Sequence, residues 1–152
     1  IVLQTPKLDH GTILDSITRK TLLKVAKEEL GWAVEEKDIS PDQAFNSTEE
    51  ILGYYAAGTA AGLAPIHGIR VGNFNNEKGE IEDLGEEIEI TKYDDKNPVG
   101  TEGQQLIDLL LSVKNGELVK KKIAQAEALP ESDEKEGVKK LIAEYSSWLQ
   151  VA

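Results

Sequence analysis

The chain has 152 residues, 30% of them charged, and a formal net charge of −11 at pH 7. So negative a charge disfavours binding to nucleic acid and to anionic membrane surfaces, and we expect neither as a partner. The absence of cysteine excludes a disulfide framework, and no apolar run reaches the ~20 residues that cross a bilayer. We therefore expect a cytoplasmic protein of 152 residues with one core.

The chain starts with Ile1 rather than methionine. Residues 1–4 already have the composition of a strand, which ends before Pro6 because proline cannot donate to a strand ladder. We expect from this start that the chain begins inside a longer protein.

A helix is predicted over residues 17–30, between two clear boundaries. Asp15 and Ser16 are good N-caps, and Gly31 ends the run. Apolar residues recur inside it at helical spacing, namely Leu22, Leu23, Ala26 and Leu30. A short strand over 32–38 and a short helix from Ser40 to Phe45 follow. The alternation of helices and strands predicts an α/β fold.

Residues 56–62 join two predicted strands, 51–55 and 63–66, through small residues, a threonine and two glycines. Such a turn lets the backbone approach a ligand and exposes N–H groups that can bind an anion. The start of the 17–30 helix is a second candidate anion site, with Thr18 supplying a hydroxyl. Each stretch alone also has an ordinary interpretation, as a tight core turn and as a helix cap that binds nothing.

The second half is predicted to be strand, then helix. Residues 66–71 continue as strand, 73–79 form a hairpin tip, and 80–90 alternate charged and apolar residues as a half-exposed strand. A largely buried helix follows over 101–113 and stops at Asn115-Gly116. Two amphipathic stripes in residues 117–152 predict a helical hairpin. Its apolar stripe can pack on its own domain or on a partner chain, and we expect the first because burial within the chain is the usual outcome. His10 and His67 have no second ligand at metal spacing, so no metal site is expected.

Several blocks together resemble the C-terminal half of a fold-type IV PLP-dependent enzyme, most like branched-chain amino acid aminotransferase. The resemblance covers residues 1–116. The matching blocks are Thr5-Pro6, residues 12–19 (TILDSITR), Gly58-Thr59-Ala60-Ala61, Pro65-Ile66, Asn97-Pro98-Val99-Gly100 and Asn115-Gly116. Asp15-Ser16 departs from the proline-glycine that the family usually has there.

The resemblance implies a fold and a cofactor site. The fold is the C-terminal large domain of the D-amino acid aminotransferase-like family, a pseudo-barrel, over residues 1–116, with the hairpin 117–152 as an extension outside it. The cofactor is pyridoxal 5′-phosphate. Leu14 would pack on its pyridine ring, while the backbone of Ile17 and Thr18 and the side chain of Thr59 would hold its phosphate. The N–H groups of Thr59 and Ala60 would bind the substrate carboxylate.

The implied reaction is amino transfer between leucine, isoleucine or valine and 2-oxoglutarate, in a full-length protein that is a homodimer. In the family the Schiff-base lysine and the acidic partner of the pyridine nitrogen precede the first strand. We therefore expect that the N-terminal half is missing, that no catalytic residue lies in this chain, and that the chain alone is inactive. Of its lysines we considered Lys7, Lys20, Lys24, Lys27, Lys120, Lys121 and Lys122, none of which has a matching context.

Two alternatives stay open at this point. One is a relative on the same fold, an aminodeoxychorismate lyase or a D-amino acid aminotransferase. The other is a non-catalytic interaction module that kept the fold. The Gly58-Thr59-Ala60-Ala61 turn favours the branched-chain enzyme over the first of these.

Overall fold

A computed structural model describes residues 1–90, 94 and 96–149 as a mixed α/β protein. The helices are α1 (Ile17–Glu28), α2 (Pro41–Phe45), α3 (Thr101–Lys114), α4 (Glu117–Ala128) and α5 (Asp133–Leu149). The strands are β1 (Val2–Thr5), β2 (Ala33–Glu36), β3 (Tyr54–Gly58), β4 (Gly62–Ile66), β5 (Gly68–Ile69), β6 (Asn73–Asn75), β7 (Glu80–Glu82) and β8 (Ile88–Glu89). This order agrees with the α/β prediction.

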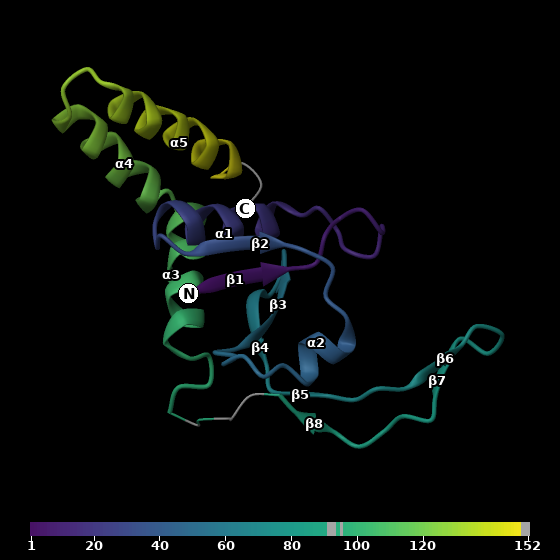
Figure 1. Ribbon diagram of the computed structural model, residues 1–152. Helices are drawn as coiled ribbons and strands as arrows, with labels where there is room; N and C mark the ends of the chain where they lie inside the picture. The colour runs from purple at the N-terminus through teal and green to yellow at the C-terminus, as the bar shows by residue number, and fades with distance from the viewer. Residues whose placement is uncertain (91–93, 95, 150–152) are drawn as a thin grey trace.

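The strands of the described residues pair as four separate two-stranded sheets. The pairs are β1–β2, β3–β4, β5–β8 and β6–β7, and only β1–β2 is parallel. A closed pseudo-barrel, which the family resemblance implies, does not appear among these pairs. The parallel pair needs a crossover connection, which α1 supplies (Figure 1).

Local signals explain where α1 begins and ends. Ser16 is its N-cap, and the Ser16 hydroxyl accepts a hydrogen bond from the Arg19 N–H at 3.2 Å. The helix ends at Glu28, two residues earlier than predicted, because the chain turns at Gly31, whose φ is +67°. The Trp32 N–H then donates to the Ala26 carbonyl at 2.9 Å, so the last turn is still satisfied.

The strands of the β3–β4 hairpin begin and end at other residues than predicted. We expected a strand over 51–55, but β3 starts at Tyr54, and Ile51 and Leu52 are exposed. The strand instead continues to Gly58, which pairs with Gly62, so the turn is only residues 59–61. Gly62 has a φ of +68°, as the residue after a three-residue hairpin loop requires. Cross-strand pairing has here outweighed the low strand preference of alanine and glycine.

The second predicted strand region is more broken and more exposed than the alternating pattern suggested. The strand expected over 66–71 stops at Ile66 and resumes only at Gly68–Ile69. Phe74 and Ile81 face each other across the β6–β7 pair, and their exposed fractions are 61% and 62%, respectively. The β6–β7 pair forms the tip of an arm that extends away from the helices, so no core covers these apolar side chains (Figure 1).

The core lies where α1 and α3 meet the hairpin of α4 and α5. Its buried residues are Leu22, Val25, Ala26, Leu63, Leu106, Leu110, Val113, Leu118, Val119 and Tyr145. We expected α3 to be buried on nearly all sides, but Leu111 is 53% exposed. The helical period explains this, because it places Leu106, Leu110 and Val113 on the inner face and Leu111 on the outer one.

Tyr55 explains why α3 contains a glycine. The Tyr55 hydroxyl donates to the Val99 carbonyl at 2.7 Å, which fixes the ring against α3. A Cβ atom on Gly103 would lie 2.5 Å from the Tyr55 hydroxyl oxygen and 2.6 Å from the ring. Only glycine allows this close approach between β3 and α3.

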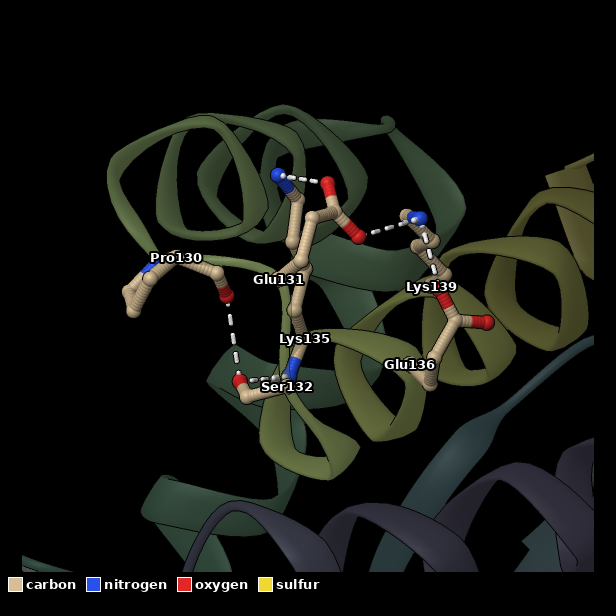
Figure 2. A network of polar contacts seen from close by, with 6 residues as sticks. All are labelled: Pro130, Glu131, Ser132, Lys135, Glu136 and Lys139. Atoms are coloured by element: carbon tan, nitrogen blue, oxygen red, sulfur yellow. Dashed lines mark hydrogen bonds and ion pairs between the residues drawn. The ribbon is translucent and has the colours of Figure 1, made fainter.

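A polar network holds the turn between α4 and α5 (Figure 2). The Ser132 hydroxyl accepts from the Lys135 N–H at 3.2 Å and so caps the start of α5. The Glu131 carboxylate pairs with Lys135 at 2.7 Å and with Lys139 at 3.7 Å. The hydrogen bond from Lys135 lowers the pKa of the Glu131 carboxyl. All these groups come from one short stretch, so the network stabilises the turn locally.

The hairpin packs on its own chain, as the sequence led us to expect. The Lys122 ammonium of α4 lies 2.9 Å from the Glu29 carboxylate at the end of α1. The Tyr145 hydroxyl of α5 donates to the same carboxylate at 3.0 Å. These contacts join three helices at one buried point. The division into a domain at 1–116 and an extension at 117–152 remains a prediction, and residues 150–152 lie outside the described part.

Candidate functional site

The candidate site is a cavity of about 340 Å³ among α1, the β3–β4 turn, α3 and α5. Its lining residues are Leu14, Asp15, Ser16, Ile17, Thr18, Thr21, Thr59, Leu110, Val113, Lys114 and Trp148. The volume lies at the lower end of the range typical of small-molecule sites, roughly 300–1,000 Å³. Apolar and polar residues both contribute, which is usual for a site that orients its ligand.

Four of the five residues that the resemblance assigned to binding line this one cavity. Leu14, Ile17 and Thr18 come from the start of α1, and Thr59 comes from the β3–β4 turn. The fold therefore brings together two stretches that are far apart in the sequence. Ala60, the fifth residue, lies in the same turn but does not line the cavity. The roles of all five as ligands of a cofactor or substrate stay predictions.

The start of α1 presents unpaired backbone donors to the cavity. The N–H groups of Ile17 and Thr18 form no hydrogen bond with the residues that the structure describes. The Ser16 hydroxyl is bonded to the next N–H, that of Arg19. Two free donors and the positive end of the helix dipole favour an anion at this position.

Two buried threonines in α1 differ in their hydroxyl partners. Thr21 is 2% exposed, and its hydroxyl donates to the Ile17 carbonyl at 2.8 Å. Thr18 is 5% exposed, and its hydroxyl has no hydrogen-bond partner among residues 1–90, 94 and 96–149. The Thr18 hydroxyl oxygen is not fully buried, since Arg19 Nε is the one buried side-chain polar atom without a partner in the described part of the chain. The Thr18 hydroxyl is therefore free to donate to a ligand in the cavity.

A buried arginine fixes the start of α1 against the β1–β2 pair. Arg19 is 7% exposed, and its Nη2 donates to the Pro6 carbonyl at 3.1 Å and to the Glu36 carboxylate. This anchor holds the neighbouring Thr18 in a defined position. A site built on an anchored helix start is more precise than one on a mobile loop.

The lining also contains residues that the sequence analysis did not assign to the site, above all Lys114 and Trp148. Lys114 lies at the end of α3, four residues after Leu110, so both share one face of that helix. The spacing relates Lys114 to Leu110, but only the packing of α3 brings both to the cavity. Trp148 belongs to α5 in the predicted extension, and only the tertiary fold brings it to the cavity.

Other candidate chemistry is weak in the described residues. His10 lies in the loop after β1 and contacts the Asp38 carboxylate at 3.0 Å, with 67% of its side chain exposed. Nowhere in the described residues do three or more His, Cys, Asp or Glu side chains group in a way that could hold a metal. None of the helices described is long and apolar enough to cross a membrane. The clearest chemistry among the described residues remains the unpaired N–H groups of Ile17 and Thr18, which favour an anion.

Comparison with known proteins gives a family match over a region that contains α1 and the β3–β4 turn. Residues 2–69 match the model of the family amino-transferase class IV. A probable branched-chain-amino-acid aminotransferase of Staphylococcus aureus (strain N315) is 40% identical over 84 residues, 51% of this chain and 23% of that protein. The branched-chain-amino-acid aminotransferase of Helicobacter pylori (strain J99 / ATCC 700824) is 39% identical over 108 residues, 70% of this chain and 25% of that protein.

A plant relative matches over a shorter stretch. Branched-chain-amino-acid aminotransferase 5, chloroplastic, of Arabidopsis thaliana is 37% identical over 68 residues, 45% of this chain and 15% of that protein. The chain thus spans about a quarter or less of the length of these curated relatives. No solved structure gives a significant match. Residues 2–69 are thus similar to the class IV aminotransferase family, and parts of the chain are similar to branched-chain amino acid aminotransferases.

Proposed function

We propose that this chain forms part of a transaminase that uses pyridoxal 5′-phosphate to transfer amino groups between branched-chain amino acids and 2-oxoglutarate. In this proposal the cavity at the start of α1 binds the phosphate end of the cofactor. The observation that carries it is the convergence of Leu14, Ile17, Thr18 and Thr59 on one cavity. The names of the relatives support amino transfer with branched-chain amino acids, while 2-oxoglutarate is taken from the family resemblance.

The residues present fit the cofactor, because the cavity offers donors where an anion needs them. The N–H groups of Ile17 and Thr18 and the hydroxyl of Thr18 are unpaired within the described chain. They would bind the phosphate oxygens, and the Thr59 hydroxyl would add a further donor from the turn. Leu14 is 81% exposed at the cavity and would cover one face of the pyridine ring.

The chain's own residues in this proposal bind and orient. Pyridoxal phosphate supplies an electron sink for amino transfer. The β3–β4 turn would orient the substrate carboxylate through the N–H groups of Thr59 and Ala60, which form no hydrogen bond with the described residues. The lysine and the acidic residue that the reaction needs would come from sequence upstream of Ile1, in a homodimeric full-length enzyme. The chain alone is then inactive.

The experiment compares threonine variants of the chain by their affinity for pyridoxal 5′-phosphate. Thr18→Ala and Thr59→Ala should each weaken binding by about 1–3 kcal/mol, the cost of losing a hydrogen bond to a charged group. Because both would contact one phosphate, a double-mutant cycle should show coupling. Thr48→Ala is the control, since Thr48 is exposed and does not line the cavity. Unchanged affinity in both cavity variants would rule out the assignment.

The reaction is tested with the product of the complete reading frame. We expect the full-length protein to form glutamate from 2-oxoglutarate when leucine, isoleucine or valine is the amino donor. We also expect Thr18→Ala and Thr59→Ala to raise the pyridoxal phosphate concentration needed for half-maximal rate. Activity only with D-alanine, or only lyase activity on aminodeoxychorismate, would favour the alternative relatives. Binding without any turnover would favour a non-catalytic module.

A further inference from the structure

The side chain of Lys114, which lines the cavity, has no partner in the described part of the chain. Lys114 lines the cavity and is half-buried, yet it forms no ion pair and no hydrogen bond through its side chain with the described residues. Lys122 is a contrasting case, because its ammonium pairs with the Glu29 carboxylate at 2.9 Å. Lysines that stabilise a fold from buried positions are paired. The ammonium group of Lys114 is therefore available to a ligand.

The charge of the cavity lining points to an anionic ligand. Asp15 is the acidic residue of the lining, and its carboxylate already pairs with Lys20 at 2.8 Å. Lys114 thus carries the one uncompensated charge among the described lining residues. A local positive charge is needed for anion binding here, since the whole chain has a net charge of −11 and repels anions.

A phosphate monoester is the ligand chemistry that this combination fits. Such a group carries about −1.5 to −2 charges near pH 7 and offers three acceptor oxygens. The start of α1 supplies neutral donors from the Ile17 N–H and from the Thr18 hydroxyl, which has no partner among the described residues, but no full positive charge. Lys114 supplies that charge from a different helix.

We propose that the Lys114 ammonium binds the phosphate group of a phosphate-ester ligand at the start of α1. The inference rests on the proposed function, in which that ester is pyridoxal 5′-phosphate. It adds to the family-derived site a residue from the end of α3. Lys114 is a binding residue in this account and takes no part in proton transfer.

Two other roles for Lys114 predict different outcomes. A cation in the last turn of a helix interacts favourably with the helix dipole. In that role Lys114→Gln would lower stability and leave ligand affinity unchanged. A lysine beside an aldehyde ligand can also react with it. In that role reduction with borohydride in the presence of pyridoxal 5′-phosphate would label Lys114.

The experiment uses two ligands without an aldehyde. Pyridoxine 5′-phosphate carries the phosphate, and pyridoxine lacks it, and equilibrium dialysis gives the affinity of the 152-residue chain for each. Lys114→Gln should weaken binding of pyridoxine 5′-phosphate about tenfold. This is the lower end of the loss expected for a charged hydrogen bond, because Lys114 is only partly buried. Binding of pyridoxine should not change. Lys114→Arg should retain most of the affinity, because it keeps the charge and the donors.

Lys120→Gln is the matched control. Lys120 is an exposed residue of α4 outside the cavity, so its loss changes the net charge equally and should leave binding as in the parent. Equal affinity of the parent and Lys114→Gln for pyridoxine 5′-phosphate would overturn the inference. So would an equal loss with both ligands, or labelling of Lys114 by pyridoxal 5′-phosphate and borohydride.

Failure of the proposed function would look different. The parent chain would then bind pyridoxine 5′-phosphate no better than pyridoxine, and Thr18→Ala would have no effect. A loss of affinity in Thr18→Ala but not in Lys114→Gln would keep the proposed function and reject only the role of Lys114.

Discussion

Replacement of Glu29 by glutamine tests whether the buried contact of three helices stabilises the fold. The Glu29 carboxylate binds the Lys122 ammonium at 2.9 Å and accepts from the Tyr145 hydroxyl at 3.0 Å. The side chains of Glu29 and Lys122 are only 10% and 11% exposed. Glu29→Gln keeps the shape and an acceptor for Tyr145, but it leaves the Lys122 charge buried without its counter-ion.

The structure sets the size of the effect. Removing one partner of a buried ion pair costs about 3–5 kcal/mol. Glutamine still accepts the Tyr145 hydrogen bond and a little water reaches the site, so we expect the lower end, about 3 kcal/mol. In a chain of this size the melting temperature should fall by about 6–12 °C. Urea unfolding followed by circular dichroism gives the free energy directly.

Two further variants separate the buried charge from other effects. The double variant with Glu29→Gln and Lys122→Met removes the unpaired charge and should recover most of the loss. Glu144→Gln is the control, because it removes an ion pair that is more exposed. Glu144 pairs with Lys24 at 2.9 Å, and the exposed fractions of the two side chains are 39% and 30%. An exposed pair of this kind is worth less than about 1 kcal/mol. The reasoning fails if Glu29→Gln is no more destabilising than Glu144→Gln.

Three further predictions concern the helices of the fold. Burial and the Glu29 carboxylate raise the pKa of the Tyr145 hydroxyl above 10.0. The protonated hydroxyl therefore contributes fully to the free energy of unfolding below pH 10. Above pH 10 this contribution is lost by up to about 1.4 kcal/mol per pH unit. Unfolding measured from pH 9 to 11 should therefore show a steeper decline in the parent than in Tyr145→Phe, and parallel curves would contradict this. Gly103→Ala should destabilise by about 1–3 kcal/mol through collision with the Tyr55 ring. Gly137→Ala in α5, where a Cβ would meet nothing within 4 Å, should stabilise by about 0.5–1 kcal/mol, so a gain at both glycines in urea unfolding would refute the packing argument.

Local signals in the sequence predicted the helices better than the strands. The Ser16 cap is an interaction between near neighbours, and α1 begins where it predicts. The same holds for α2, where Ser40 and Gln43 form a capping box. Strand limits depend on a partner strand, so the start of β3 at Tyr54 and its end at Gly58 followed from pairing with β4. Exposure of Ile81 depends on where the arm lies, which alternation alone does not encode.

The candidate site could be predicted from sequence only in part. Leu14, Ile17, Thr18 and Thr59 were assigned through the family resemblance, and the fold places them around one cavity. Lys114 and Trp148 were missed for a physical reason. They lie in α3 and α5, and their distance from α1 is set by helix packing rather than by spacing in the sequence.

The central claim is that the start of α1 and the β3–β4 turn bind the phosphate of the cofactor. The most direct measurement is an amide ¹H–¹⁵N correlation spectrum of the ¹⁵N-labelled chain during titration with pyridoxine 5′-phosphate and, separately, with pyridoxine. The account predicts that the amide signals of Ile17, Thr18 and Thr59 shift with the phosphorylated ligand much more than with pyridoxine. Shifts confined to residues outside the cavity, or equal shifts with both ligands, would contradict it.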